Sequence, residues 1–181
     1  TKGEFLSVEL ELKVLADVGL VGLPNAGKST LLSVMTTAKP KIADYPFTTL
    51  QPHLGIVKYG EYQSFVMADI PGLIEGASEG KGLGHQFLKH IERNKILLFM
   101  IDIEEQNPID VYNQLMDELV GFNKDLLDKD RLIVRTKIDT ASEDVDERWS
   151  SFPEEFIDIS SVSNQGLNTL KDKLVSFLSA S

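Results

Sequence analysis

The chain has 181 residues, 42% of them hydrophobic, which fits one globular domain with a full core and leaves little room for a second. It has no cysteine, which excludes disulfides and thiolate metal sites and fits a reducing, cytoplasmic compartment. The net charge of −10 opposes broad adhesion to nucleic acid, and the longest strongly apolar run, residues 96–101, is far too short to span a bilayer. We therefore expect no membrane partner.

The first fifteen residues differ in pattern from the rest. Apolar and polar side chains alternate from Leu6 to Val14, which is the period of a half-buried strand. We interpret residues 1–15 as the stub of an upstream β-rich domain or as a junction strand, and residues 16–181 as the domain that carries the site. An edge strand of that domain, or a purification remnant, is the alternative.

From Ala16 onward, short apolar runs alternate with helical patterns. The runs predict six strands, at residues 18–21, 56–59, 65–68, 96–101, 132–134 and 156–159. The helical patterns fall at residues 29–37, 86–94, 111–127, 145–151 and 167–178. This alternation predicts an α/β fold with a mainly parallel six-stranded sheet and helices on both faces, in which ligands gather at the carboxyl ends of the strands.

A phosphate-binding loop follows the first run. The segment Gly22-Leu23-Pro24-Asn25-Ala26-Gly27-Lys28-Ser29 reads G-x-x-x-x-G-K-S and leads into the first helical pattern. In such a loop, backbone N–H groups surround the phosphates. Lys28 can reach the β- and γ-phosphates, and the Ser29 hydroxyl can ligate Mg²⁺. We also count the next residue, Thr30, among those that bind the nucleotide.

Two further segments offer groups to the metal and the γ-phosphate. Asp69, after the third run, is placed to hold Mg²⁺, often through water, and the backbone N–H of Gly72 can bind the γ-phosphate. Thr49, before the second run, offers a hydroxyl to the same metal, whereas Thr48 is equally well explained as a turn cap. The remaining nucleotide-binding candidates in these segments are Phe47, Leu50, Gln51, Ile70 and Pro71.

The last two runs end in segments suited to a guanine base. These are Thr136-Lys137-Ile138-Asp139 and Ser160-Ser161-Val162. The Asp139 carboxylate can accept the ring N–H and the exocyclic amine of guanine, a donor pair that adenine lacks. Lys137 can lie along the base, and the backbone N–H of Ser161 can meet the guanine carbonyl oxygen. The segments therefore predict GTP and GDP as ligands, and an ATPase of the same superfamily is disfavoured.

Taken together, these motifs resemble the G domain of the Obg family of translation-associated GTPases. The most specific likeness is the glycine-rich stretch at residues 69–88, which is similar to the family's second switch, and residues 39–50 and 12–19 are also similar. The resemblance covers nearly the whole chain. It implies a Ras-like fold, an absent amino-terminal domain, and a cytoplasmic role in large ribosomal subunit assembly and stress signalling. We expect a monomer that meets the ribosomal subunit, or its precursor, through other domains.

The chain departs from the family at one position. Thr136 stands where the family normally has Asn, whose amide contacts guanine and ties the base segment to the phosphate loop. We expect Asp139 to keep the selectivity. The shorter side chain should weaken affinity and loop rigidity by one or two hydrogen bonds, at roughly 0.5–1.5 kcal/mol each.

Catalysis should be slow. Leu73 occupies the position where Ras-type enzymes have a water-orienting Gln, and the first switch loop has no arginine. We assign catalytic roles to Lys28, Thr49, Gly72 and Asn25. In similar potassium-stimulated GTPases, an Asn at the position of Asn25 helps to hold a monovalent cation, so K⁺ joins Mg²⁺ as a candidate cofactor; a plain turn residue is the alternative.

Two hypotheses about function stay open. In the first, the chain is a Mg²⁺-dependent GTPase that slowly hydrolyses GTP to GDP and phosphate. In the second, it is a binding module that senses GTP and GDP with negligible hydrolysis. Elsewhere, we expect Trp149 to be a packing residue and the acidic run at residues 142–147 to be a solvated face.

Overall fold

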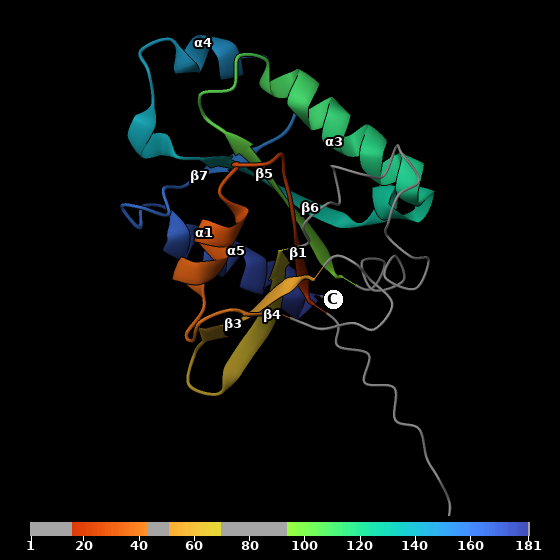
Figure 1. Ribbon diagram of the computed structural model, residues 1–181, viewed down its shortest axis with the longest axis vertical. Coiled ribbons are helices and arrows are strands. Elements are labelled where there is room, and N and C mark those ends of the chain that lie inside the picture. Colours follow the sequence, from red (N-terminus) through yellow and green to blue (C-terminus); the bar gives the residue numbers. More distant parts are fainter. Residues whose placement is uncertain (1–15, 43–50, 70–93, 181) are drawn as a thin grey trace, which may run out of the picture.

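The computed structural model describes residues 16–42, 51–69 and 94–180. In these parts of the chain, the strands form one sheet in the order β2-β3-β4-β1-β5-β6-β7 (Figure 1). The strands are β1 (Val18–Val21), β2 (Lys41–Ile42), β3 (His53–Tyr59), β4 (Gln63–Asp69), β5 (Ile96–Asp102), β6 (Asp130–Thr136) and β7 (Phe156–Asp158). The α-helices are α1 (Lys28–Met35), α3 (Pro108–Phe122), α4 (Val145–Trp149) and α5 (Leu167–Ala180), and the 3₁₀ turns are η1 (Lys124–Asp128) and η2 (Ile138–Thr140).

The sheet is mainly parallel, as the sequence predicts. β1 lies between β4 and β5 and pairs in parallel with both, and β6 and β7 continue the parallel part. Among the strands that the structure describes, those that pair antiparallel are β3 with β2 and β3 with β4, at one edge of the sheet. The predicted count of six strands is wrong by one, because β2 has two exposed residues and no apolar run to announce it. Parallel pairing aligns the carboxyl ends of β1, β4, β5, β6 and β7 at one edge of the sheet.

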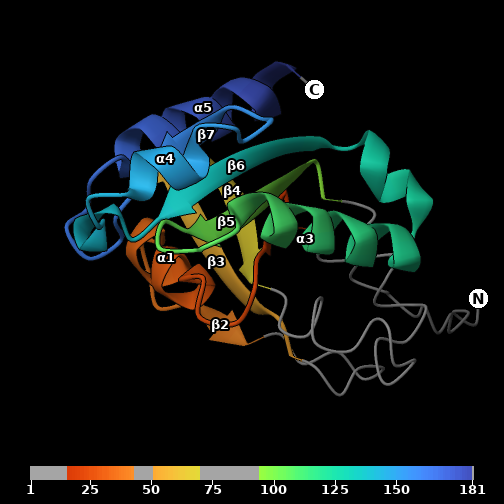
Figure 2. The same cartoon turned by 90° about the horizontal axis from the view of Figure 1, so that it is seen from above.

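Helices cover both faces of the sheet (Figure 2). On one face, Leu31 and Leu32 of α1 and Leu170 and Leu174 of α5 pack in a cluster with β1, β4, β5 and β6. On the other face, α3 and α4 pack in a second cluster. The central strand β5 is buried at every residue except Asp102. This burial on both faces explains why β5 is the longest apolar run in the sequence.

The predicted helices are found where the structure describes them, with different ends. The pattern at residues 111–127 is divided, because Asn123 adopts an extended conformation that ends α3, and its side chain accepts a hydrogen bond from Asp125 N that begins η1. The predicted helix at residues 86–94 lies outside the described residues except for Asn94. None of the helices in the described ranges combines the length and apolar character that a membrane span requires.

Two contacts fix the strands that carry the base segments. Arg135 forms a bidentate ion pair with Asp158, its cross-strand partner, at 2.6 and 2.7 Å. The guanidinium also lies 5.4 Å from the centre of the Trp149 ring. Trp149 is 3% exposed, which confirms its predicted packing role, and its Nε1 donates to Ile103 O. These contacts hold β7 and α4 against β6.

Candidate nucleotide-binding site

The phosphate loop turns sharply between β1 and α1. Asn25 and Gly27 have φ values of 67° and 94°, in the left-handed region, and Ala26 N donates to Leu23 O at 3.1 Å. A Cβ at Gly22 would lie 2.7 Å from Met100 O, so the loop can pass β5 this closely only with glycine there. The backbone is thus held in a compact turn by its own contacts.

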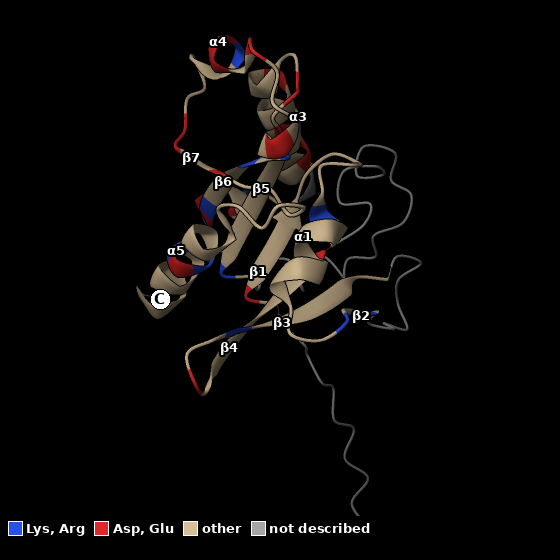
Figure 3. Cartoon of the chain, turned by 90° about the vertical axis from the view of Figure 1, so that its left-hand side faces the viewer, with Lys and Arg blue, Asp and Glu red and all other residues tan. Residues whose placement is uncertain are grey.

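One basic side chain, that of Lys28, lies across this loop. Lys28 Nζ donates to Gly22 O at 2.8 Å and to Leu23 O at 3.0 Å, which places the ammonium group across the loop. The loop leads directly into the amino terminus of α1, whose first turn has no acidic residue. Helix amino termini attract anions through their unpaired N–H groups. Figure 3 shows a basic segment at the start of α1, whereas acidic segments lie in α3 and around α4, where a basic segment is also present.

The predicted metal ligands Ser29 and Asp69 lie together. Ser29 Oγ donates to Asp69 Oδ2 at 2.7 Å. Asp69 ends β4 and is 4% exposed, and its Oδ1 makes no hydrogen bond within the described residues. Hydroxyl and carboxylate oxygens are the ligands that Mg²⁺ prefers, and a buried carboxylate oxygen without a donor fits a bound cation. The residues present therefore fit Mg²⁺.

Thr136 contacts the phosphate loop even though its side chain is shorter than that of Asn. Its hydroxyl is 2.9 Å from Ala26 O in the phosphate loop and 3.3 Å from Ile101 O, so the Thr side chain does reach the loop. The residue is 3% exposed. Because a hydroxyl has one hydrogen, it can donate to only one of these carbonyl groups at a time. The Thr136 side chain therefore contacts the phosphate loop with a single donor hydrogen, whereas the amide of an Asn side chain would offer two.

The two predicted base segments are neighbours. Ile138 N donates to Ile159 O at 3.2 Å, which joins the segment that contains Asp139 to the segment after β7. Ser160 is buried, and its Oγ accepts from Ser163 N at 3.0 Å, which shapes the turn through Ser161 and Val162. The segments that the sequence predicts to read guanine thus meet at the same end of the sheet as the phosphate loop.

Sequence reasoning overlooked Asp102 as a partner of the base segment. Asp102 ends β5, and its Oδ2 is 2.6 Å from Lys137 Nζ. Lys137 has a φ of 60°, which turns the chain from β6 into η2. The sequence signal that could have identified Asp102 is an acidic residue directly after an apolar run, because the same signal identified Asp69.

Some predicted residues cannot be placed in this site. Phe47, Thr48, Thr49 and Leu50, and the second-switch residues Ile70, Pro71 and Gly72, lie outside the described residues. Gln51 and Thr30 are described and exposed. Within the described ranges, no cluster of three or more His, Cys, Asp or Glu side chains is arranged to hold a metal. A metal at Ser29 and Asp69 would therefore take few protein ligands, as Mg²⁺ commonly does.

The fold and this site define the chain as a Ras-like, P-loop GTP-binding domain. A family model described as "50S ribosome-binding GTPase" matches residues 17–137. GTPase Obg of Pelodictyon phaeoclathratiforme is 61% identical over 173 residues, which are 96% of this chain and 51% of that protein. GTPase Obg of Flavobacterium psychrophilum is 59% identical over 179 residues, 94% of this chain and 53% of that protein. The chain belongs to the Obg family of GTPases, and it spans about half the length of these curated relatives.

Solved structures confirm the predicted fold class. The G domain of the T. maritima FeoB iron transporter has a TM-score of 0.65 at 24% identity, over 91% of this chain and 99% of that one. A single-residue variant of Aquifex aeolicus Era, bound to GDP·AlF₄⁻, has a TM-score of 0.63 at 27% identity, over 90% of this chain and 56% of that one. Both likenesses extend over nearly the whole of this chain.

Proposed function

We propose that this chain binds GTP and GDP with Mg²⁺, hydrolyses GTP slowly to GDP and phosphate, and acts as a switch in ribosome assembly or the stress response. One observation carries the proposal: the phosphate loop contacts both other parts of the site. At its end Ser29 contacts Asp69, and in its middle Ala26 contacts Thr136. Phosphate, metal and base groups are therefore connected in one structure, as a guanine nucleotide requires.

The phosphates would be bound by the loop and by Lys28. The Lys28 ammonium group already donates to the carbonyl groups of Gly22 and Leu23, so a small rotation of the side chain would bring it to a bound β- or γ-phosphate. Ser29 and Asp69, joined by Thr49, would hold Mg²⁺, which neutralises charge on the phosphates. The hydrogen bond from Ser29 to Asp69 supports this role, because it holds the two oxygens close together.

The base would be read by Asp139. Its carboxylate accepts the ring N–H and the amine of guanine, Lys137 lies along the base, and the N–H of Ser161 meets the carbonyl oxygen. Support comes from the Ile138–Ile159 hydrogen bond, which brings these two segments together. Thr136 contributes through the loop, because its hydroxyl contacts the backbone of Ala26.

Turnover would be slow because few groups stabilise the transition state. Gly72 and Thr49 are proposed from sequence to bind the γ-phosphate and the metal, and Leu73 cannot orient water by hydrogen bonding. A monovalent cation beside Asn25, most simply K⁺, would supply the missing charge. The exposed position of Asn25 at the outer turn of the loop is compatible with this role.

We also propose a cellular location and a binding partner for the protein. We place the action in the cytoplasm, with the large ribosomal subunit or its precursor as partner through parts of the protein beyond this domain, and with the domain itself as a monomer. The family description and the Obg relatives support this setting.

Single-turnover hydrolysis of GTP, with and without ribosomal subunits, tests the proposal against its alternative. A switch enzyme should convert GTP measurably faster than the uncatalysed reaction in at least one of these conditions. A sensing module with negligible hydrolysis would stay at the uncatalysed rate in both conditions.

A further inference from the structure

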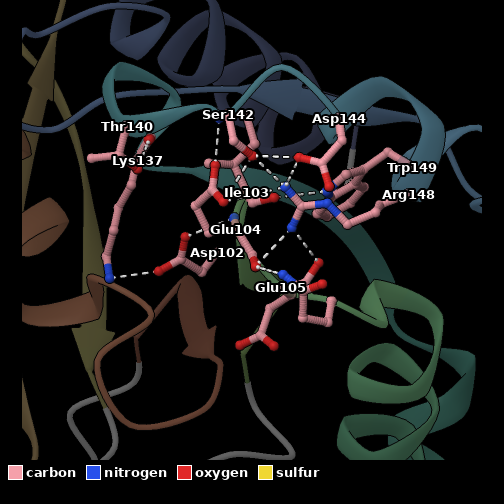
Figure 4. Close-up of polar contacts among 11 residues, drawn as sticks. Asp102, Ile103, Glu104, Glu105, Lys137, Thr140, Ser142, Asp144, Arg148 and Trp149 are labelled. Atoms are coloured by element: carbon pink, nitrogen blue, oxygen red, sulfur yellow. Dashed lines mark hydrogen bonds and ion pairs between the residues drawn. The ribbon is translucent and has the colours of Figure 1, made fainter.

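A cluster of polar side chains joins the segment after β5 to the segment after η2 (Figure 4). Arg148 of α4 lies at its centre and donates to Glu104 O at 2.8 Å, Glu105 O at 3.1 Å and Ser142 Oγ at 2.7 Å. Its side chain is only 10% exposed. A guanidinium group so enclosed needs compensating charge, and Glu104 and Asp144 supply it at 3.2 Å each.

Glu104 connects this cluster to the base segment. Its carboxylate accepts from Ser142 N at 2.6 Å and from Ser142 Oγ at 3.0 Å. The backbone hydrogen bond from Ser142 is the main reason that the pKa of Glu104 is below its ordinary value, with the Ser142 hydroxyl and Arg148 adding to it. The charged form of Glu104 thus holds the chain just beyond η2.

The other end of the base segment, at Lys137, is held by Asp102, which stands two residues before Glu104. Asp102 forms the ion pair with Lys137, and its Oδ1 also accepts from Glu104 N at 3.1 Å. Residues 137 and 142 are therefore both fixed to residues 102–104, at the end of β5 and just after it, and Asp139 lies between them. Inside the span, Thr140 N donates to Lys137 O, which closes η2.

We propose that Asp102 and Glu104, with Arg148 holding Glu104, are positioning residues that fix residues 137–142 so that both carboxylate oxygens of Asp139 face a guanine base. This inference rests on the proposed function, in which Asp139 reads guanine. A segment held at both ends loses less conformational freedom when the base binds. It also keeps the direction of the carboxylate, on which a paired hydrogen bond depends.

The proposal predicts a change in specificity as well as in affinity. Inosine nucleotides lack the amine of guanine and so can use only one of the two hydrogen bonds. In Glu104→Ala, the loosened carboxylate should lose the paired geometry, so GDP affinity should fall about tenfold and IDP affinity by a smaller factor of about three. The preference for GDP over IDP should therefore shrink roughly threefold.

The neighbouring Glu105→Ala is a matched control. Glu105 offers only its carbonyl group to Arg148, and its carboxylate points away from the cluster in Figure 4. The experiment measures GDP and IDP affinity by calorimetry for wild type, both Ala variants and the milder Glu104→Gln, together with thermal unfolding without nucleotide. We expect the GDP preference to fall in both Glu104 variants and to stay at the wild-type value in Glu105→Ala. An unchanged preference in the Glu104 variants would overturn the proposal even if their melting temperatures fell, because a purely structural role lowers stability alone.

Asp139→Asn, tested in the same assay with XDP, separates the two levels of inference. If this variant does not shift preference from GDP toward XDP, the assignment of Asp139 fails and the positioning role fails with it. If it does shift, an unchanged GDP-to-IDP ratio in the Glu104 variants counts against the positioning role alone.

Discussion

Replacing Thr136 tests whether the base segment and the phosphate loop act as one unit. Thr136→Val keeps the shape of the side chain and replaces the hydroxyl, which lies 2.9 Å from Ala26 O, with a methyl group. Thr136→Asn instead supplies two amide hydrogens, enough for both carbonyl groups that the hydroxyl now approaches. The two variants should move nucleotide affinity in opposite directions.

The expected size of these effects follows from the burial of Thr136 and Ala26. Ala26 and Thr136 are 4% and 3% exposed, so in Thr136→Val the Ala26 carbonyl has little access to water and stays unpaired, at a cost of about 1–3 kcal/mol in stability. For a chain of this size, that cost lowers the melting temperature by about 2–12 °C. If the hydrogen bond from Thr136 to Ala26 O also holds the phosphate loop in the conformation that binds phosphate, its loss corresponds to a decrease of about 2- to 12-fold in GDP affinity. Thr136→Asn should gain a factor in the same range.

Release of a fluorescent GDP analogue, followed by stopped flow, and thermal unfolding without nucleotide provide the assay. Thr36→Val is the matched control, because the Thr36 hydroxyl is buried and makes no hydrogen bond within the described residues. Removing it should leave stability and GDP release almost unchanged. The reasoning is refuted if Thr136→Val releases GDP at the wild-type rate, or if it destabilises the protein no more than Thr36→Val does.

Three further changes probe the metal, the cation and a buried carboxyl group. Ser29→Ala should weaken GDP binding several-fold with Mg²⁺ present and much less in EDTA; equal weakening in both would remove Ser29 from the metal site. Hydrolysis at saturating GTP should rise severalfold when K⁺ replaces Na⁺ at constant ionic strength, and Asn25→Ala should abolish the difference; equal rates in both salts for wild type would dismiss the cation. Burial raises the pKa of the Glu118 carboxyl above its ordinary 4.5, so ionisation there opposes folding near pH 7. Because the Glu118 side chain is only partly buried, water screens much of this effect. Glu118→Gln should therefore stabilise the protein at pH 7 by no more than about 0.5 kcal/mol, and the gain in melting temperature should vanish as the pH falls through the raised pKa to below 4.5; a gain that persists at low pH would contradict this cause.

Much of the fold could be predicted because its signals are local. The phosphate loop and the buried strands are visible in consecutive residues, since a strand covered on both faces must be a continuous apolar run. β2 gave no such signal, because its two residues are exposed and owe their conformation to pairing with β3. The end of α3 at Asn123 was hidden because the apolar period continues into η1, where Leu126 is buried.

Individual residues of the candidate site can be proposed from the sequence, but the contacts between them cannot. The hydroxyl of Thr136 meets a carbonyl group 110 positions away, and Arg148 meets one 44 positions away. Such contacts depend on which strands are neighbours, and no local pattern records that. The acidic run at residues 142–147 is exposed apart from Val145, as predicted. Its sequence gave no sign that Ser142 and Asp144 also contact Arg148.

The central claim is that the phosphate loop and Asp139 together make this chain a guanine-nucleotide-binding protein. The most direct test is calorimetric titration of wild type and Asp139→Asn with GDP, ADP and XDP in the presence of Mg²⁺. Our account predicts that wild type binds GDP far more tightly than ADP or XDP, and that Asp139→Asn prefers XDP, because its amide can donate to the xanthine carbonyl group. Equal affinity of wild type for GDP and ADP, or an unaltered GDP preference in Asp139→Asn, would contradict it.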